Sequence, residues 1–169
     1  QDSVNLEILK PSLGRKAPDA VIYNQALMAL GAREVVMADS LARLLPANDG
    51  TAYLKSITAA LAGDYESAYP QIASRGGLNE VLLLLCMERN ATALSKCNDM
   101  MTFPEYSQNA KFWYIHAVCA NRNEDIFTAM ISLETALALD PDLEETARLD
   151  SDVMDVIELI RPTEESTNY

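Results

Sequence analysis

Apolar residues recur at intervals of three and four along most of the chain, in runs that end at glycines, prolines or polar clusters. This spacing places the apolar residues on one face of a helix, so the pattern predicts helices rather than strands. The first run starts at Pro18, a residue favoured in the first helical turn, and ends at Gly31. A second run over 35–45 ends before Pro46, which completes one pair of helices.

The same arrangement of two runs and a polar corner is repeated three more times. The predicted pairs lie at 53–61 with 65–72, at 79–88 with 90–101, and across 108–139. Two short helical patterns follow Pro141 and stop at Pro162. Repeated helix pairs of similar length are typical of helical repeat proteins. We therefore predict an all-α solenoid of about four αα-hairpins with short capping helices at its C-terminal end.

The two ends of the chain do not share this pattern. The stretch "VNLEIL" within residues 1–16 alternates apolar and polar residues, which is a strand signal without a partner elsewhere. Residues 1–16 are either a leader or the end of a preceding domain, and we favour the second interpretation. We assign 17–161 to the helical repeat domain and 162–169 to a disordered tail.

One ten-residue stretch, "FWYIHAVCAN", collects the only Trp, the only His, one Cys and a Tyr. On a helix its residues form two apolar stripes and one mixed stripe, the last made of Lys111, Tyr114, Val118 and Asn121 with Arg122 adjoining. We interpret Trp113 and His116 as core residues on an apolar stripe, not as ligands. Truncation of Trp113 to Ala is then expected to cost about 3–5 kcal/mol.

The order Trp113, Ala117, Ala129, Leu133, Ala136 and Pro141 resembles the tetratricopeptide repeat in residue types and spacing. "AGDYESA" at 62–68 is similar to the corner of the same repeat. The resemblance implies a right-handed superhelix whose first helices line a concave, peptide-binding groove. Three residues depart from the repeat's usual types: His116, Ala120 and Lys55. The segment 139–153, "LDPDLEETARLDSDV", resembles repeat proteins of the Bacteroidetes cell envelope.

Carried onto this chain, the resemblance gives a candidate set of groove residues. They are Tyr53, Ile57, Lys111, Tyr114, Val118, Asn121 and Arg122. Lys111 and Arg122 are cations in a chain of net charge −12, and they could hold a carboxylate of the partner. The alternative is that both are solvated or paired with acids of the chain itself.

Composition narrows the classes of partner and chemistry. A net charge of −12 without a basic stripe argues against nucleic acid. Acidic residues concentrate in 140–165, either as a solvated cap or as a docking patch for a basic partner. The longest apolar run, Val81–Met87, is too short to span a membrane. We expect a protein or peptide partner, and a monomer or weak homo-oligomer.

Few residues are available for catalysis or for binding a metal. Three Cys and one His do not make a zinc pattern or a disulfide framework, although a bridge between Cys86 and Cys97 is conceivable. The chain has no Ser–His–Asp order and no glycine-rich phosphate loop. We expect no catalytic residue, no cofactor and no metal site.

Together with these patterns, the resemblance to the tetratricopeptide repeat implies a non-catalytic scaffold that binds a peptide or protein segment in its groove. The resemblance of 139–153 implies a role in a cell-envelope assembly, in the periplasm or at the surface of a Gram-negative bacterium. The alternative is a structural spacer or oligomerisation module of a larger surface protein without a dedicated ligand.

Overall fold

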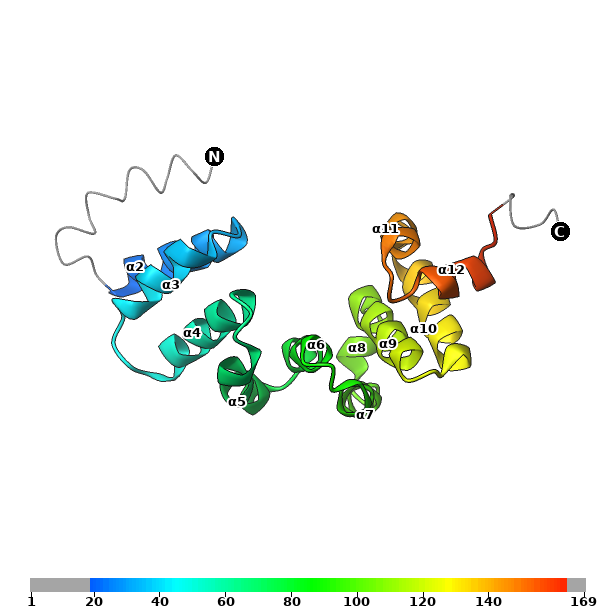
Figure 1. Ribbon diagram of the computed structural model, residues 1–169, viewed down its shortest axis with the longest axis horizontal. Coiled ribbons are helices and arrows are strands. Elements are labelled where there is room, and N and C mark those ends of the chain that lie inside the picture. The colour runs from blue at the N-terminus through cyan, green and yellow to red at the C-terminus, as the bar shows by residue number, and fades with distance from the viewer. Residues whose placement is uncertain (1–18, 164–169) are drawn as a thin grey trace. The chain divides into compact units, whose positions relative to one another are not determined.

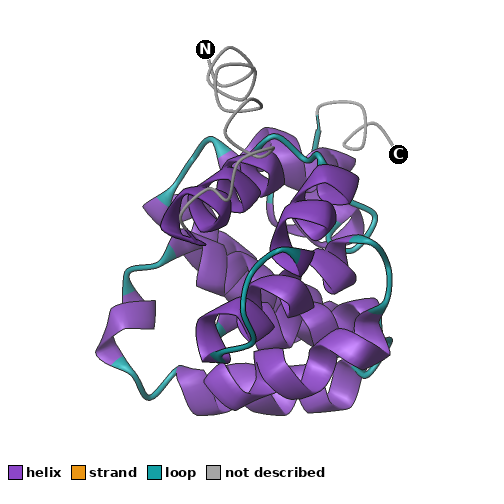
Figure 2. Cartoon of the chain, turned by 90° about the vertical axis from the view of Figure 1, so that its left-hand side faces the viewer, coloured by secondary structure: helices purple, strands orange, loops and turns teal. Residues whose placement is uncertain are grey.

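A computed structural model describes residues 19–163 of the chain. The predicted leader or domain end at 1–16, and most of the predicted tail at 162–169, lie outside these residues. Within them all regular structure is helical, with eleven helices and no strand (Figures 1 and 2). The all-α prediction is therefore confirmed. The chain divides into two compact units, one ending at Arg75 and one beginning at Gly76.

The first unit contains four helices, and each packs against the next one along the chain (Figure 1). They are α2 (Asp19–Gly31), α3 (Val35–Arg43), α4 (Asp49–Leu61) and α5 (Tyr65–Arg75). The breaks between these helices coincide with "GARE", "LPAN" and "AGD", which are polar or contain Gly or Pro, but α4 begins at Asp49, four residues before the predicted start at 53. Asn48 caps α4, since its side chain accepts the Thr51 N–H at 3.0 Å.

The second unit contains seven helices among the described residues. They are α6 (Leu78–Cys86), α7 (Asn90–Met100), α8 (Pro104–Ser107), α9 (Ala110–Arg122), α10 (Ile126–Leu139), α11 (Leu143–Leu149) and α12 (Met154–Ile160). Helix α7 packs against both α6 and α9, and α9 packs along α10. The short helices α11 and α12 pack on each other and on α10. The predicted arrangement of neighbouring helix pairs is confirmed, and the connection between α7 and α9 contains the single turn α8.

Four corners between paired helices share one backbone geometry. Each has a residue with positive φ: Arg33 (61°), Gly63 (89°), Glu88 (57°) and Glu124 (63°). The N–H of the following residue donates to the carbonyl five residues back, at 2.8–3.0 Å in all four corners. This is the Schellman arrangement, which satisfies the carbonyls at the end of a helix. Only the corner at Gly63 carries the residue that adopts positive φ without a steric penalty.

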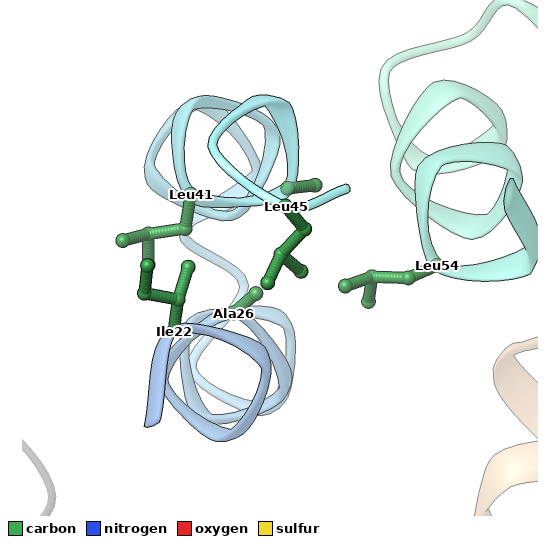
Figure 3. Packing of buried hydrophobic residues seen from close by; sticks show 6 residues of the cluster. Ile22, Ala26, Leu41, Leu45 and Leu54 are labelled. Carbon is green, nitrogen blue, oxygen red and sulfur yellow. The ribbon is translucent and has the colours of Figure 1, made fainter. Parts of the chain in front are cut away.

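The core of the first unit is built from aliphatic side chains on three helices. Ile22 and Ala26 from α2 meet Leu41 and Leu45 from α3, and Leu54 projects toward them from α4 (Figure 3). All five are at most 7% exposed. Ala26 lies between α2 and α3. Its small side chain lets the two helices pack closely, since a larger one would hold them apart.

The core of the second unit is centred on α9 and α10. Phe112 is its largest fully buried side chain. Small residues, among them Ala117, Ala120, Ala129 and Ala136, are completely buried along the two helices. Ala129 and Leu133 lie on the buried face of α10, whereas Ile126, beside the corner, is 37% exposed.

Candidate functional site

Within "FWYIHAVCAN", the rings of Phe112, Trp113 and His116 pack on one another, with centroids 5.3–6.0 Å apart. Trp113 Nε1 donates to the carbonyl of Ser107 at 3.0 Å, and its side chain is only partly buried. Phe112, its neighbour in sequence, is the aromatic residue that is fully buried. The interpretation of Trp113 as a core residue is correct only in part, because its ring packs edge-on against the buried His116 ring but the residue itself is only partly buried.

His116 is the buried histidine that its stripe position predicts, with 2% of its surface exposed. Its Nε2 lies 2.9 Å from Asn98 Oδ1, and its Nδ1 lies 2.7 Å from Ser132 Oγ. Since the amide oxygen only accepts, Nε2 carries the proton and Nδ1 accepts the Ser132 hydroxyl. Burial lowers the pKa of His116, an effect that the charge of Asp125 partly offsets. The ring is thus a neutral connector between α7, α9 and α10.

The mixed stripe of α9 faces the segment that joins α11 to α12. Tyr114 Oη donates to Asp150 Oδ2 at 2.7 Å. Asn121 Nδ2 donates to the carbonyl of Asp152 at 2.8 Å and to Asp155 Oδ1 at 3.0 Å.

Arg122 makes the most extensive set of contacts in this region. Its Nε and Nη2 donate to the two carboxylate oxygens of Asp152, at 2.9 and 2.7 Å. Its Nη1 donates to the carbonyl of Leu85 on α6 at 2.9 Å. The hydrogen bond from Arg122 to Asp152 raises the pKa of the guanidinium above its ordinary value. Arg122 therefore does hold a carboxylate, and that carboxylate belongs to this chain.

The two remaining candidates on α9 differ in exposure. Val118 is 6% exposed and contributes to the core. Lys111, near the start of the helix, is exposed. Of the five candidates on α9, three thus contact the Asp150–Asp155 segment, one is buried, and Lys111 alone projects from the surface.

The two candidates in the first unit both lie on α4 and are partly buried. Tyr53 and Ile57 are four residues apart, so they share one face of the helix. The guanidinium carbon of Arg75 lies 3.9 Å from the centre of the Tyr53 ring. This cation–π contact fixes the tyrosine against α5 while part of the ring remains accessible.

One surface was missed by the sequence analysis. Helix α10 has a shallow, mostly apolar depression lined by Phe127, Met130, Ile131, Glu134, Thr135 and Ala138. Phe127 is 76% exposed and Ile131 56%. The only sequence signal was that α10 is apolar on more than one side, and helical periodicity cannot decide which side is covered.

Several carboxylates in the described part of the acidic C-terminal region are engaged in contacts within the second unit. Glu144 accepts Arg148 at 2.7 Å and Arg161 at 2.6 Å. These two hydrogen bonds lower the pKa of Glu144. Asp150 and Asp152 likewise accept hydrogen bonds from Tyr114 and Arg122 of the same chain. These internal contacts favour a C-terminal cap over a docking patch for a basic partner.

Neither a metal site nor a membrane span is found in the described part of the chain. Over residues 19–163, no three side chains among His, Cys, Asp and Glu are grouped so that they could hold a metal ion. None of the helices in this range combines the length and apolar character needed to cross a bilayer.

No protein-family model matches the chain, and no curated protein matches it at a significant level.

Proposed function

We propose that this protein is a non-catalytic scaffold that binds a peptide or protein segment on its helical hairpins, which form a tetratricopeptide-like solenoid. Two observations support the repeat architecture: helices packed in neighbouring pairs, and four corners with the same Schellman geometry. Such repeats bind extended partners along rows of side chains on successive helices.

The face of α4 that carries Tyr53 and Ile57 supports the binding role best. A tyrosine held in one orientation by Arg75 at 3.9 Å loses little side-chain entropy when a partner packs on it. Tyrosine also combines a large apolar ring with a polar tip, and it is enriched among residues that dominate binding energy. The proposed contact residues of the first unit are therefore Tyr53 and Ile57, with Lys111 as the accessible candidate of the second.

The proposal is tested with a peptide selected from a random displayed library against the wild-type chain. The affinity of that peptide is then measured for the Tyr53→Ala/Ile57→Ala variant by titration calorimetry. We expect a loss of about tenfold or more, which corresponds to 1.4 kcal/mol or more. A Val36→Ala/Leu44→Ala variant of the same unit, which changes two exposed side chains on α3 and at its C-terminal end instead of on α4, is the matched control and is expected to bind like wild type.

The second candidate function is a structural spacer or oligomerisation module. This function is favoured because the side chains of Tyr114, Asn121 and Arg122 form hydrogen bonds within the second unit, between α9 and residues 150–155, and so are not free to bind a partner. If no peptide is enriched, or if the α4 variant and its control lose affinity equally, the spacer function replaces the binding function.

A location in the periplasm or at the surface of a Gram-negative cell is part of the same proposal. It is supported by the resemblance of 139–153 to envelope repeat proteins of Bacteroidetes. Fractionation of the source cells, followed by detection of the chain with an antibody, tests this location directly.

A further inference from the structure

We propose that Cys97 and Cys119 are a disulfide-forming pair that can covalently join α7 to α9, while Cys86 remains a free thiol. The two sulfur atoms lie 3.8 Å apart. Both side chains are completely buried, and both are free thiols in the structure. The pair differs from the Cys86–Cys97 bridge that the sequence left open.

The position of the two sulfurs requires little rearrangement for a bond. A disulfide has a sulfur–sulfur distance of about 2.05 Å. The two sulfur atoms must therefore approach each other by less than about 2 Å to form the bond. Because α7 and α9 already pack against each other, the backbone on both sides is held in place.

The surroundings also make the two thiols chemically unequal. The hydrogen bond between them lowers the pKa of Cys119 and raises that of Cys97, and burial acts to raise the pKa of both thiols. The positive charge of Arg122, one helical turn further along α9, also lowers the pKa of Cys119. Cys119 is thus the better nucleophile of the two, because the thiolate is the reacting form.

The reaction is thiol–disulfide exchange with a small external disulfide such as oxidised glutathione. The Cys119 thiolate attacks one sulfur of the external disulfide, whose sulfur–sulfur bond breaks and releases one thiolate. The Cys97 thiolate then attacks the Cys119 sulfur, forms the Cys97–Cys119 bond and releases the second thiolate. Two electrons pass from the protein sulfurs to the external disulfide, and the two cysteine protons end on the released thiols.

Burial decides when this exchange can take place. With neither sulfur accessible in the folded chain, the external disulfide reaches them during folding or through local opening of the contact between α7 and α9. Cys86, in contrast, is exposed at the end of α6. It can form mixed disulfides with small thiols, but these are removed by a reductant that leaves a buried bridge intact.

Tryptic digestion identifies which two cysteines are paired, because each cysteine lies on a different tryptic peptide. Cleavage after Arg75, Arg89, Lys96, Lys111 and Arg122 separates peptides 76–89, 97–111 and 112–122. The wild-type chain is refolded from denaturant in a glutathione redox buffer, alkylated, digested and analysed by mass spectrometry. We expect peptides 97–111 and 112–122 to be joined, with a mass two hydrogens below their sum.

The Cys86→Ser variant is the control, and it is expected to form the same bridge with the same yield. The oxidised form is also expected to unfold at a midpoint roughly 5–15 °C above the reduced form, since the bond constrains the unfolded chain. Three free thiols after refolding, or a bridge that includes peptide 76–89, would overturn the proposal. An unchanged midpoint in a chain that does carry the bridge would leave the pairing correct and refute its stabilising role.

Discussion

Arg122 and Asp152 are joined by two parallel hydrogen bonds, from Nε at 2.9 Å and from Nη2 at 2.7 Å, although thirty residues separate them in sequence. The remaining donor, Nη1, reaches the carbonyl of Leu85. One guanidinium therefore connects α6, the end of α9 and the turn before α12. This arrangement explains why a residue chosen as a partner-binding cation is an internal contact instead.

Removal of this guanidinium is expected to destabilise the second unit. Arg122→Ala leaves the Asp152 carboxylate and the Leu85 carbonyl without their donor, and it should lower the free energy of unfolding by about 1–3 kcal/mol. Arg122→Lys keeps the charge but cannot form two parallel bonds, so it is expected to recover less than half of the loss. Urea unfolding followed by circular dichroism measures both. A double-mutant cycle with Asp152→Asn that shows no coupling energy would contradict the assignment.

The pH dependence of stability should contain a contribution from His116. Because its pKa is lowered in the folded chain, protonation favours the unfolded state. The stability that neutral His116 supports is complete above its unfolded pKa of about 6.5 and declines as the pH falls from there through the lowered folded pKa.

His116 is the only histidine, so a His116→Gln variant isolates this effect. We expect the wild-type chain to lose more unfolding free energy than the variant between about pH 7 and pH 5, and the imidazole NMR signal to titrate below 6.5. Equal losses in the two proteins, or an imidazole that titrates above 6.5, would show that the ring is not held neutral.

Two glycines should respond to alanine substitution with opposite signs. An added Cβ meets no atom within 4 Å at either Gly31 or Gly63, so neither substitution causes a steric clash with a neighbouring residue. Gly63 has φ of 89°, whereas no positive φ is found at Gly31, the last residue of α2. Gly63→Ala is expected to lower the unfolding free energy by about 1 kcal/mol, and Gly31→Ala to raise it by about 0.5–1 kcal/mol. Thermal unfolding of the two variants decides this, and a shift of the same sign in both would refute the corner geometry.

The non-glycine corners give a complementary prediction. Glu124 has φ of 63° at the turn between α9 and α10. A side chain in this region of the Ramachandran map costs roughly 1 kcal/mol relative to glycine. Glu124→Gly is therefore expected to stabilise the second unit by up to about 1 kcal/mol, measured by urea unfolding. Glu105→Gly, which places the same change inside α8, should not stabilise it.

The two aromatic residues that begin α9 should differ in their contribution to stability. Phe112 is fully buried, so Phe112→Ala is expected to cost about 3–5 kcal/mol. Trp113 is partly buried and anchored by one hydrogen bond to Ser107, so Trp113→Ala is expected to cost less, about 1–2 kcal/mol. Unfolding followed by circular dichroism compares them without relying on the indole. A larger loss for Trp113 would restore the sequence-based assignment.

The sequence determined the helices, most of their boundaries and the order of the helix pairs. These depend on local properties: the spacing of apolar residues, the breaks at glycine and proline, and the caps supplied by residues such as Asn48. Gly63 could be identified as a corner for the same reason. The buried state of His116 also followed from its position on an apolar stripe.

The residues that each helix face contacts could be found only from the packing of the helices in three dimensions. Tyr114, Asn121 and Arg122 contact residues about thirty positions away, and helical periodicity carries no information about contacts at that separation. The pairing of Cys97 with Cys119, and not with Cys86, depends on α7 lying against α9. A stripe of side chains shows which residues share a face. The packing of neighbouring helices, which buries that face or leaves it open to solvent, arises from the whole chain.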